Sequence, residues 1–381
     1  MDILFSPLQI RNKTAANRFT AQAMEGNDAD SGGIPSDRTI ERYKKLAAGG
    51  WGIVVVEAIS AVETSLARIN GLFINRKNID GFKKLVDAFR KENKEGLLFF
   101  QITHSGGQSG KFSDRTSITQ GNEGYRFLSS DEIEKIKESF VEACLLANEA
   151  GADGVDFKMC HGYLGGEILR PKNTRQDKWG GSFENRVRFL KEGICEIKAR
   201  LKDKNFILGS RISFYEGIKG GCGTAAADDI TEDLTEMLEI LRIMDSLDMD
   251  YINVSAGIPA ITGAVTRPTE PSKELAYHHL RYAKIAKKMI ESEGRKLKVI
   301  GSAYSSYKDK APEMMAEMLS KNYTDFCGFG RQTFADPLLP KKLLSGGKIN
   351  WCILCSGCSK LMARQINDGC IVYNDYYREL N

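Results

Sequence analysis

The sequence predicts an α/β fold, a single (β/α)8 TIM barrel followed by a short cysteine-rich extension. Three observations lead to this prediction: eight short apolar runs recur along the chain, amphipathic segments separate them, and polar side chains follow the runs. Runs rich in Val, Ile, Leu and Phe are typical of parallel strands that are buried on both faces. Eight strands, each followed by a helix, favour one barrel over a doubly wound sheet, although the alternation alone does not exclude two smaller α/β domains.

The expected elements follow one another in a regular order. The strands are Arg18–Met24, Ile53–Ala58, Leu97–Thr103, Gly154–Lys158, Ile207–Ser213, Tyr251–Ala256, Lys298–Ala303 and Asp325–Arg331. The helices are Pro35–Ala48, Ile79–Glu92, Ser130–Ala150, Asn185–Arg200, Thr231–Ser246, Glu274–Ser292, Lys308–Ser320 and Pro337–Leu344. Ser129 and Glu132 form an expected capping box before the third helix. We expect the barrel over residues 1–345 and the cysteine-rich tail over residues 346–381.

Composition excludes several classes of protein. Of 381 residues, 42% are hydrophobic and 27% charged, which supports a large core and excludes disorder. The formal charge of 54 − 50 = +4 is too small for a nucleic-acid binder, and no apolar stretch approaches the length of a membrane span. The amino-terminal residues lack a basic region, and nine cysteines are an odd number, so we expect a cytoplasmic, reducing environment.

The polar side chains that follow the strands point to one active site. Barrel enzymes carry their catalytic groups at the carboxyl ends of the strands, so these residues are expected around one mouth. They are Glu25, Glu57, Gln101, His104, Lys158, His161, Arg211, Ser255, Ser302 and Arg331. Gln101 offers an amide that both donates and accepts, and Gly106 and Gly107 permit close backbone approach, a combination that suits a flat heteroaromatic ligand. Gln101 and His104 could equally be hydrogen-bonded residues of the rim.

A longer motif makes the prediction specific. The tract from Asn173 to Arg186 is a polar, glycine-containing string with neither helix nor strand periodicity. Together with Asn17-Arg18 and with Gly328-Phe-Gly330-Arg331, this tract resembles the Old Yellow Enzyme family of FMN-dependent ene-reductases over roughly residues 1–345. The resemblance implies a (β/α)8 barrel with FMN at its mouth, in agreement with the strand count.

The resemblance also implies which residues bind FMN. Gln101 corresponds to the residue that hydrogen-bonds the flavin pyrimidine edge, and Arg211 to the cation near flavin N1, unless Arg211 is a salt-bridged residue of the barrel interior. A positive charge there stabilises the reduced, anionic flavin. The phosphate site is expected at Gly301, Ser302, Gly330 and Arg331, because backbone N–H groups and a guanidinium suit phosphate oxygens. Ala23, Met24 and Ala58 complete the expected cofactor contacts.

The resemblance assigns catalytic roles to three residues. Tyr163 corresponds to the family's proton donor, although a buried tyrosine bonded to backbone is the alternative. His161 corresponds to the second member of a pair that polarises the substrate oxygen, and Lys158 replaces the first member. Lys158 either binds the oxyanion or pairs with a carboxylate such as Glu57 or Glu25. Glu25 itself departs from the family and would oppose an anionic flavin unless a cation neutralises it.

The tail contains a second candidate site. Cys352, Cys355, Cys358 and Cys370 form the pattern C-x2-C-x2-C-x11-C, and four thiolates at such spacing can hold one metal centre. The pattern is similar to the 4Fe-4S motif of the branch that includes 2,4-dienoyl-CoA reductase and trimethylamine dehydrogenase, but it is one residue shorter. Zinc and unmetallated thiols are the alternatives.

These observations predict an FMN-dependent oxidoreductase that reduces the C=C bond of an α,β-unsaturated carbonyl or carboxylic compound. NADH, NADPH or an external electron-donor protein would be the reductant, and neither nucleic acid nor membrane is an expected partner. Relatives are often oligomeric, so a homo-oligomer is possible. The alternatives are an amine dehydrogenase or demethylase that passes electrons from FMN to an iron–sulfur cluster, and a non-catalytic flavin electron-transfer protein.

Overall fold

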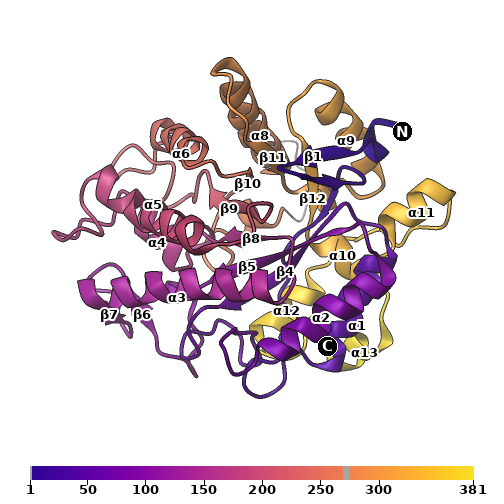
Figure 1. Cartoon of the computed structure of the whole chain (residues 1–381), viewed down its shortest axis with the longest axis horizontal. Helices are drawn as coiled ribbons and strands as arrows, with labels where there is room; N and C mark the ends of the chain where they lie inside the picture. The colour runs from indigo at the N-terminus through magenta and orange to yellow at the C-terminus, as the bar shows by residue number, and fades with distance from the viewer. Residues whose placement is uncertain (1, 269–274) are drawn as a thin grey trace.

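A closed barrel of eight parallel strands forms the centre of the chain. The computed structural model describes residues 2–268 and 275–381. In it, each strand pairs with the next in chain order and the last pairs with the first (Figure 1). The barrel strands are β3 (Phe19–Ala21), β4 (Ile53–Ser60), β5 (Leu97–Thr103), β8 (Gly154–Phe157), β9 (Ile207–Ser213), β10 (Tyr251–Ser255), β11 (Lys298–Gly301) and β12 (Phe326–Phe329). Each lies in or overlaps an expected strand, so the predicted barrel is confirmed.

Helices surround the barrel where the apolar periodicity predicts them. They are α1 (Asp37–Ala48), α2 (Ile79–Glu92), α3 (Ser130–Glu149), α5 (Phe183–Arg200), α6 (Thr235–Ser246), α8 (Leu275–Ser292), α9 (Ala311–Ser320) and α11 (Leu339–Ser345). The capping box of Ser129 and Glu132 is present at the start of α3. Two helices begin three or four residues later than expected. Glu232, before α6, forms a single β-bridge with Thr224, and Lys308, the expected start of α9, is a kink inside the short helix η3. The expected helix start at Glu274 lies outside the described residues.

Short elements fill the connections. They are η1 (Asp2–Phe5), β1 (Leu8–Ile10), β2 (Lys13–Ala15), η2 (Gly106–Gln108), β6 (Thr116–Ser117), β7 (Arg126–Phe127), α4 (Leu164–Leu169), α7 (Gly263–Thr266), η3 (Tyr304–Lys310), α10 (Arg331–Ala335), α12 (Gly357–Ala363) and α13 (Asp375–Leu380). Strands β1 and β2 form an antiparallel hairpin whose Ile10 and Ala15 pack against barrel residues such as Ile53 and Leu97. Because Ile53 and Leu97 begin their strands, the hairpin closes the amino-terminal end of the barrel.

The alternation of side chains along the strands places the polar groups at the other end. In β5, Leu97 and Phe99 belong to the apolar cluster inside the barrel, whereas Leu98 and Phe100 pack in the outer cluster with the helices. Gln101 is the next inward position. The same alternation makes Arg211 in β9 and Asn253 in β10 point inward. They lie closer to the carboxyl ends of their strands than the inward residues Ile207 and Tyr251. The interior therefore changes from apolar to polar toward the carboxyl ends of the strands, as active sites of barrels require.

The tail returns to the barrel and packs beside its first helices. Helix α13 lies near α1 in Figure 1, and the Arg38 guanidinium of α1 stacks 3.6 Å from the ring centroid of Tyr376 in α13. Asn27 donates to the Ile366 carbonyl at 3.0 Å, which fixes the tail against the loop after β3. The division of the chain at residue 345 stays a prediction.

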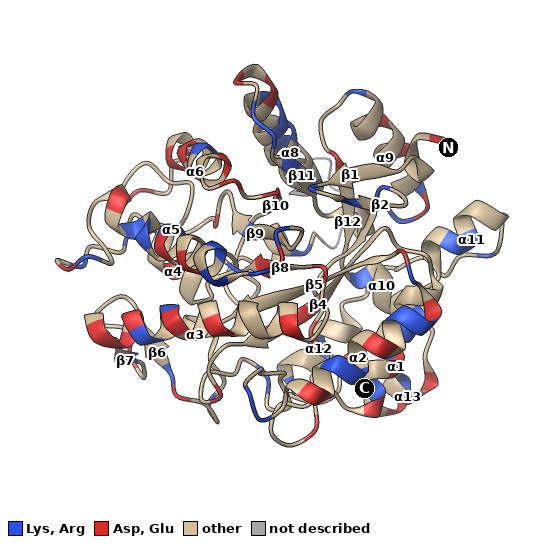
Figure 2. Cartoon of the chain, in the orientation of Figure 1, with Lys and Arg blue, Asp and Glu red and all other residues tan. Residues whose placement is uncertain are grey.

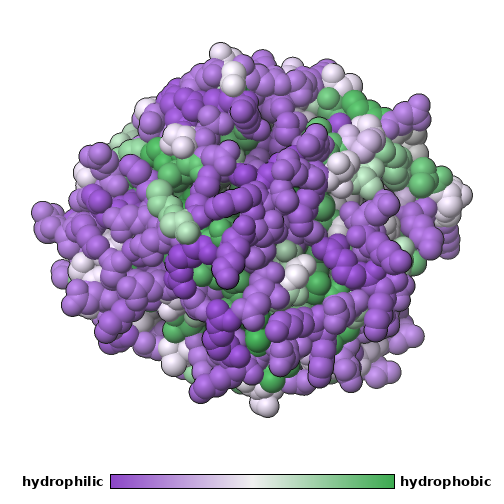
Figure 3. Space-filling view, in the orientation of Figure 1, coloured by the Kyte–Doolittle hydropathy of each residue, from purple (hydrophilic) through white to green (hydrophobic). Residues whose placement is uncertain are grey.

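Charge and apolar groups are dispersed over the surface. Lys and Arg alternate with Asp and Glu on the outer helices (Figure 2), and the visible face is mostly hydrophilic with small separate apolar patches (Figure 3). None of the helices in the described part of the chain is long and apolar enough to cross a bilayer.

Candidate active site at the carboxyl end of the barrel

A cavity opens where the carboxyl ends of the strands meet the tail. Its empty volume is about 1080 Å³, including the part open to solvent. Eleven of the twelve residues predicted to bind FMN or to act in catalysis line it: Ala23, Met24, Ala58, Gln101, Lys158, His161, Tyr163, Arg211, Ser302, Gly330 and Arg331. Gly301 does not line the cavity, because it ends β11 and its N–H donates to Thr324 Oγ1 at 3.1 Å. The cavity also contains residues that the motifs did not indicate, chiefly Gln22, Arg68, Arg267, Ser359 and Met362.

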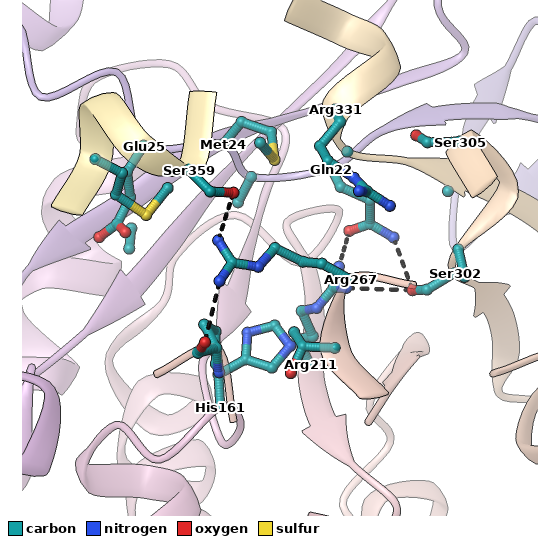
Figure 4. Close-up of a pocket in the computed structure, with 18 of the residues that line it drawn as sticks. Gln22, Met24, Glu25, His161, Arg211, Arg267, Ser302, Ser305, Arg331 and Ser359 are labelled. Atoms are coloured by element: carbon teal, nitrogen blue, oxygen red, sulfur yellow. Dashed lines mark hydrogen bonds between the residues drawn. The ribbon is translucent and has the colours of Figure 1, made fainter. Parts of the chain in front are cut away.

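Arg211 is the centre of a buried polar network on the cavity floor. Its Nη1 donates to Gln22 and, at 3.2 Å, to Asn253 Oδ1, while its Nη2 lies 3.2 Å from Ser255 Oγ and 3.3 Å from Ser302 Oγ (Figure 4). Burial lowers the pKa of Arg211, although the nearby Cys160 and Asp156 oppose this shift. Because the side chains that bond the guanidinium are neutral, it forms no direct ion pair among the described residues and can present positive charge to whatever fills the cavity.

Besides Nε of the half-buried Arg68, three donors on the cavity wall find no hydrogen-bond partner among the described residues. They are Gln101 Nε2, Arg211 Nε and Arg331 Nη1, and all three side chains are buried. An unpaired buried donor costs about 1–3 kcal/mol, so these groups indicate a bound ligand with matching acceptors. Arg331 lies beside Ser306, to which its Nη2 donates at 3.3 Å. An amide and a guanidinium at the floor with a second guanidinium at the rim match the carbonyl edge and the phosphate of FMN.

Tyr163 is held in a cluster of charged side chains. Its hydroxyl donates to both oxygens of Glu25 at 3.0 and 3.1 Å, and Arg68 forms an ion pair with the same carboxylate at 2.9 Å. Lys158 Nζ lies 3.3 Å from the centroid of the Tyr163 ring. Lys158 forms no ion pair with Glu25 or Glu57 in the described residues. It contacts the phenol ring instead.

The environment fixes the protonation of this cluster. Burial and the neighbouring Glu25 raise the pKa of Tyr163 well above its ordinary value, so the phenol keeps its proton. Burial would raise the pKa of Glu25, but Arg68, Lys158 and the Tyr163 hydroxyl outweigh it and the pKa is lowered. Burial lowers the pKa of Lys158, against the attraction of Glu25. The directions of these pKa shifts favour a neutral Tyr163 phenol and an ionised Glu25 carboxylate that is paired with Arg68.

His161 stands beside Tyr163 in a left-handed backbone conformation. Its φ is +62°, and its backbone N–H donates to Ser213 Oγ at 3.1 Å. The Nε2 atom lies 2.7 Å from Ser255 Oγ. Burial, followed by repulsion from Arg211 and Lys158, lowers the pKa of His161 well below 6.5, so the imidazole is neutral. A neutral imidazole has one ring N–H with which to donate to a substrate oxygen.

Two other predicted rim residues have structural partners. His104 does not line the cavity: its Nδ1 accepts from the Gly106 N–H at 3.1 Å, and burial lowers its pKa to about 3. Glu57 accepts from the Gly26 N–H at 2.7 Å and forms an ion pair with Arg42, while burial raises its pKa to about 7. Glu57 therefore binds the loop after β3 and Arg42, and it forms no ion pair with Lys158 in the described residues.

The four cysteines of the tail line one small cavity beside the first. Cys352, Cys355, Cys358 and Cys370 surround an empty volume of about 340 Å³, and none forms a disulfide. Within residues 2–268 and 275–381, no group of three or more His, Cys, Asp or Glu side chains is gathered tightly enough to hold a single metal ion. Cys358 also lines the larger cavity, so the two cavities share a wall. The thiols enclose a space and do not converge on a point.

Comparisons with known proteins agree with this geometry. Residues 3–350 match the sequence profile described as the NADH:flavin oxidoreductase / NADH oxidase family. An NADH oxidase from Thermoanaerobacter brockii is 29% identical over 377 residues, covering 93% of this chain and 53% of the relative. An N,N-dimethylglycine/sarcosine dehydrogenase from Chromohalobacter salexigens is 27% identical over 360 residues, covering 90% and 48%.

The fold is also found among solved structures. The 2-naphthoyl-CoA reductase in its complex with 2-naphthoyl-CoA superposes with a TM-score of 0.86 at 24% identity, covering 100% of this chain and 58% of that chain. The chain spans about half the length of the curated relatives that it matches.

Proposed function

This chain belongs to the NADH:flavin oxidoreductase / NADH oxidase family, as its motifs predicted, and from that membership we propose that it is an FMN-dependent ene-reductase. Its substrate would be an α,β-unsaturated carbonyl or carboxylic compound, and NADH or NADPH its reductant. The observation that carries the proposal is the protonated Tyr163 phenol at the mouth of a cavity whose buried donors lack partners.

The residues of the cavity fit FMN. Gln101 Nε2 and the Arg211 guanidinium would hold the carbonyl edge of the isoalloxazine ring, and Arg331 with Ser302 would hold the phosphate. When bound, FMN supplies a hydride to the β-carbon of the alkene. The positive charge of Arg211 favours the reduced form of the cofactor, because that form is an anion.

Tyr163 would protonate the α-carbon. The cluster of Arg68, Lys158 and Glu25 carries a net charge of +1 while the phenol is neutral. When Tyr163 gives up its proton the cluster becomes neutral, so the two cations offset the negative charge left on the phenol oxygen. A general acid in such a position typically accelerates the step about 10²- to 10⁴-fold.

His161 and Lys158 would hold the substrate oxygen. Ser255 Oγ receives a hydrogen bond from Arg211 and can donate its own proton to His161 Nε2. The imidazole proton then resides on Nδ1 and is free for a substrate carbonyl. Lys158 supplies a second, charged donor near the Tyr163 ring. Two donors aimed at the oxygen stabilise the negative charge that develops there during hydride addition.

The tail would bind an iron–sulfur cluster. A single zinc ion requires four thiolates at about 2.3 Å, and the cysteines of the tail are not gathered in that way. A 4Fe-4S cluster is a larger group that four thiolates surround, which suits a cavity lined by all four sulfur atoms. The shared wall at Cys358 would bring this cluster near the flavin.

The cavity disfavours the oxidation of a cationic amine. Five cationic side chains line it, namely Arg68, Lys158, Arg211, Arg267 and Arg331, against the single carboxylate of Glu25. Both oxygens of Glu25 are already engaged by Tyr163 and Arg68. An ammonium group would therefore meet repulsion without a free counter-ion.

The deciding experiment is an anaerobic comparison of substrates on the flavin-loaded protein. We expect NADH or NADPH to bleach the flavin and an α,β-unsaturated acid or ketone to restore its colour. Bleaching of the oxidised flavin by secondary or tertiary amines, with no reoxidation by any unsaturated compound, would contradict the proposal.

A further inference from the structure

Arg267 is a cavity residue that neither the motifs nor the flavin site accounts for. It follows α7 in the loop after β10, and Figure 4 shows its side chain extending across the cavity. Its Nη1 donates to Ser359 Oγ in α12 at 2.8 Å, and its Nη2 donates to the Pro259 carbonyl at 3.0 Å. These contacts join the tail to the barrel and hold the guanidinium in the cavity. A ligand that occupies this part of the cavity would lie beside Arg267.

The charge of Arg267 meets no direct counter-ion within the described residues, although Cys358 and Asp368 attract it without forming an ion pair. It forms no ion pair there, and its two partners are a hydroxyl and a carbonyl oxygen. The other cations of the cavity have evident roles: Arg68 pairs with Glu25 at 2.9 Å, and Arg211 and Arg331 are assigned to the flavin. In its contacts with the described residues, each terminal nitrogen of Arg267 uses one of its two N–H groups, which leaves the second N–H of each for a ligand.

Two remaining N–H groups on one planar guanidinium form the fork that a carboxylate accepts. The cavity holds five cations and one carboxylate, so its charge favours an anion over a neutral or cationic ligand. A neutral enone would leave the half-buried charge of Arg267 without a direct counter-ion, whereas a carboxylate would supply one.

We propose that Arg267 recognises a carboxylate of the substrate and selects α,β-unsaturated carboxylic acids over neutral unsaturated compounds. This inference rests on the proposed reduction of a C=C bond and narrows its substrate class. In this arrangement Ser359 and Pro259 position the guanidinium, and the tail thereby shapes the substrate site as well as the cysteine-lined cavity.

The test uses matched acid and amide ligands. We would compare 3-phenylpropenoate with its primary amide in steady-state reduction by the wild-type protein, by Arg267→Gln and by Arg267→Lys. Arg364→Gln is the control, because Arg364 is an exposed residue of the tail. Among the contacts described, its guanidinium donates only to the carbonyls of Leu380 and Asn381. Arg267→Gln should raise KM for the acid about 10- to 100-fold, as expected for loss of a charge-assisted pair, and change the amide little. Arg267→Lys, which keeps the charge without the fork, should lie between.

Binding of a saturated acid separates this inference from the proposed function. 3-Phenylpropanoate cannot be reduced, so its dissociation constant, read from the shift of the flavin absorption band, reports recognition alone. Arg267-dependent binding of this acid, with no turnover of any alkene, would support the inference while the ene-reductase proposal failed. If Arg267→Gln changed the KM for the acid and the KM for the amide equally, the proposed role of Arg267 would be overturned. Loss of FMN from that variant, measured as the flavin-to-protein ratio, would overturn it as well, because Arg267 would then be a cofactor residue.

Discussion

Replacement of Tyr163 by Phe should separate the two halves of the reaction. The substitution removes only the hydroxyl, whose contacts are the two hydrogen bonds to Glu25 at 3.0 and 3.1 Å. The ring remains for Lys158 to contact, and Glu25 keeps its ion pair with Arg68. Loss of a general acid should slow protonation of the alkene about 10²- to 10⁴-fold, equivalent to about 3–5 kcal/mol. Reduction of the flavin by NADH, which needs no phenol, should change little.

The assay is anaerobic stopped-flow spectroscopy of each half-reaction. Bleaching of the flavin by NADH reports the first, and return of its colour with an unsaturated acid reports the second. The raised pKa of Tyr163 also predicts that the wild-type second half-reaction shows no loss through phenol ionisation up to pH 10. Tyr251→Phe is the matched control, because that buried phenol bonds the Val155 carbonyl low in the barrel. Equal slowing of both half-reactions in Tyr163→Phe would refute the role of Tyr163 as the proton donor.

Three further predictions concern the cofactor, the tail and the pH dependence of stability. Arg331→Gln should weaken FMN binding about 10- to 100-fold in a fluorescence titration, because the unpartnered Nη1 is lost; unchanged affinity would contradict the phosphate site. Cys358→Ser should lower iron and acid-labile sulfide in the purified protein, whereas Cys195→Ser, at an exposed cysteine outside the tail, should leave both unchanged. Burial raises the pKa of Glu167 from 4.5 to about 7. Protonated Glu167 therefore adds about 3 kcal/mol to the free energy of unfolding at low pH, and this contribution is lost as the pH rises through 7. Glu167→Gln should remove that part of the pH dependence in urea unfolding at pH 5 and pH 8, and an unaltered difference between the two pH values would count against the shift.

The barrel could be predicted because each strand is a buried apolar run. In β5 the run Leu97 to Phe100 alternates between the interior and the helices, and Gln101 continues the inward parity at the mouth. The hairpin of β1 and β2 was not predicted, because each of its strands has only three residues and three of the six are polar. Its position depends on contacts with Ile53 and Leu97, which are distant in the sequence.

The candidate site could be predicted only where a motif marked it. Lys158, His161 and Tyr163 follow one strand, so the strand end located all three in the cavity. Arg68 and Arg267 lie singly in long connections, where an isolated arginine has no periodic signal and its partner is far along the chain. The sequence offered Glu57 and Glu25 equally as partners of Lys158. In the structure Lys158 does not pair with Glu57, because Glu57 forms its ion pair with Arg42 of α1.

The central claim is that the cavity at the barrel mouth holds FMN. The direct test is an ultraviolet–visible spectrum of the anaerobically purified protein, with FMN released by acid and iron and sulfide assayed on the same sample. We expect flavin bands, one FMN per chain, and about four irons with four sulfides. A protein without flavin that also fails to bind added FMN at micromolar concentration would contradict the roles assigned to Gln101, Arg211 and Arg331.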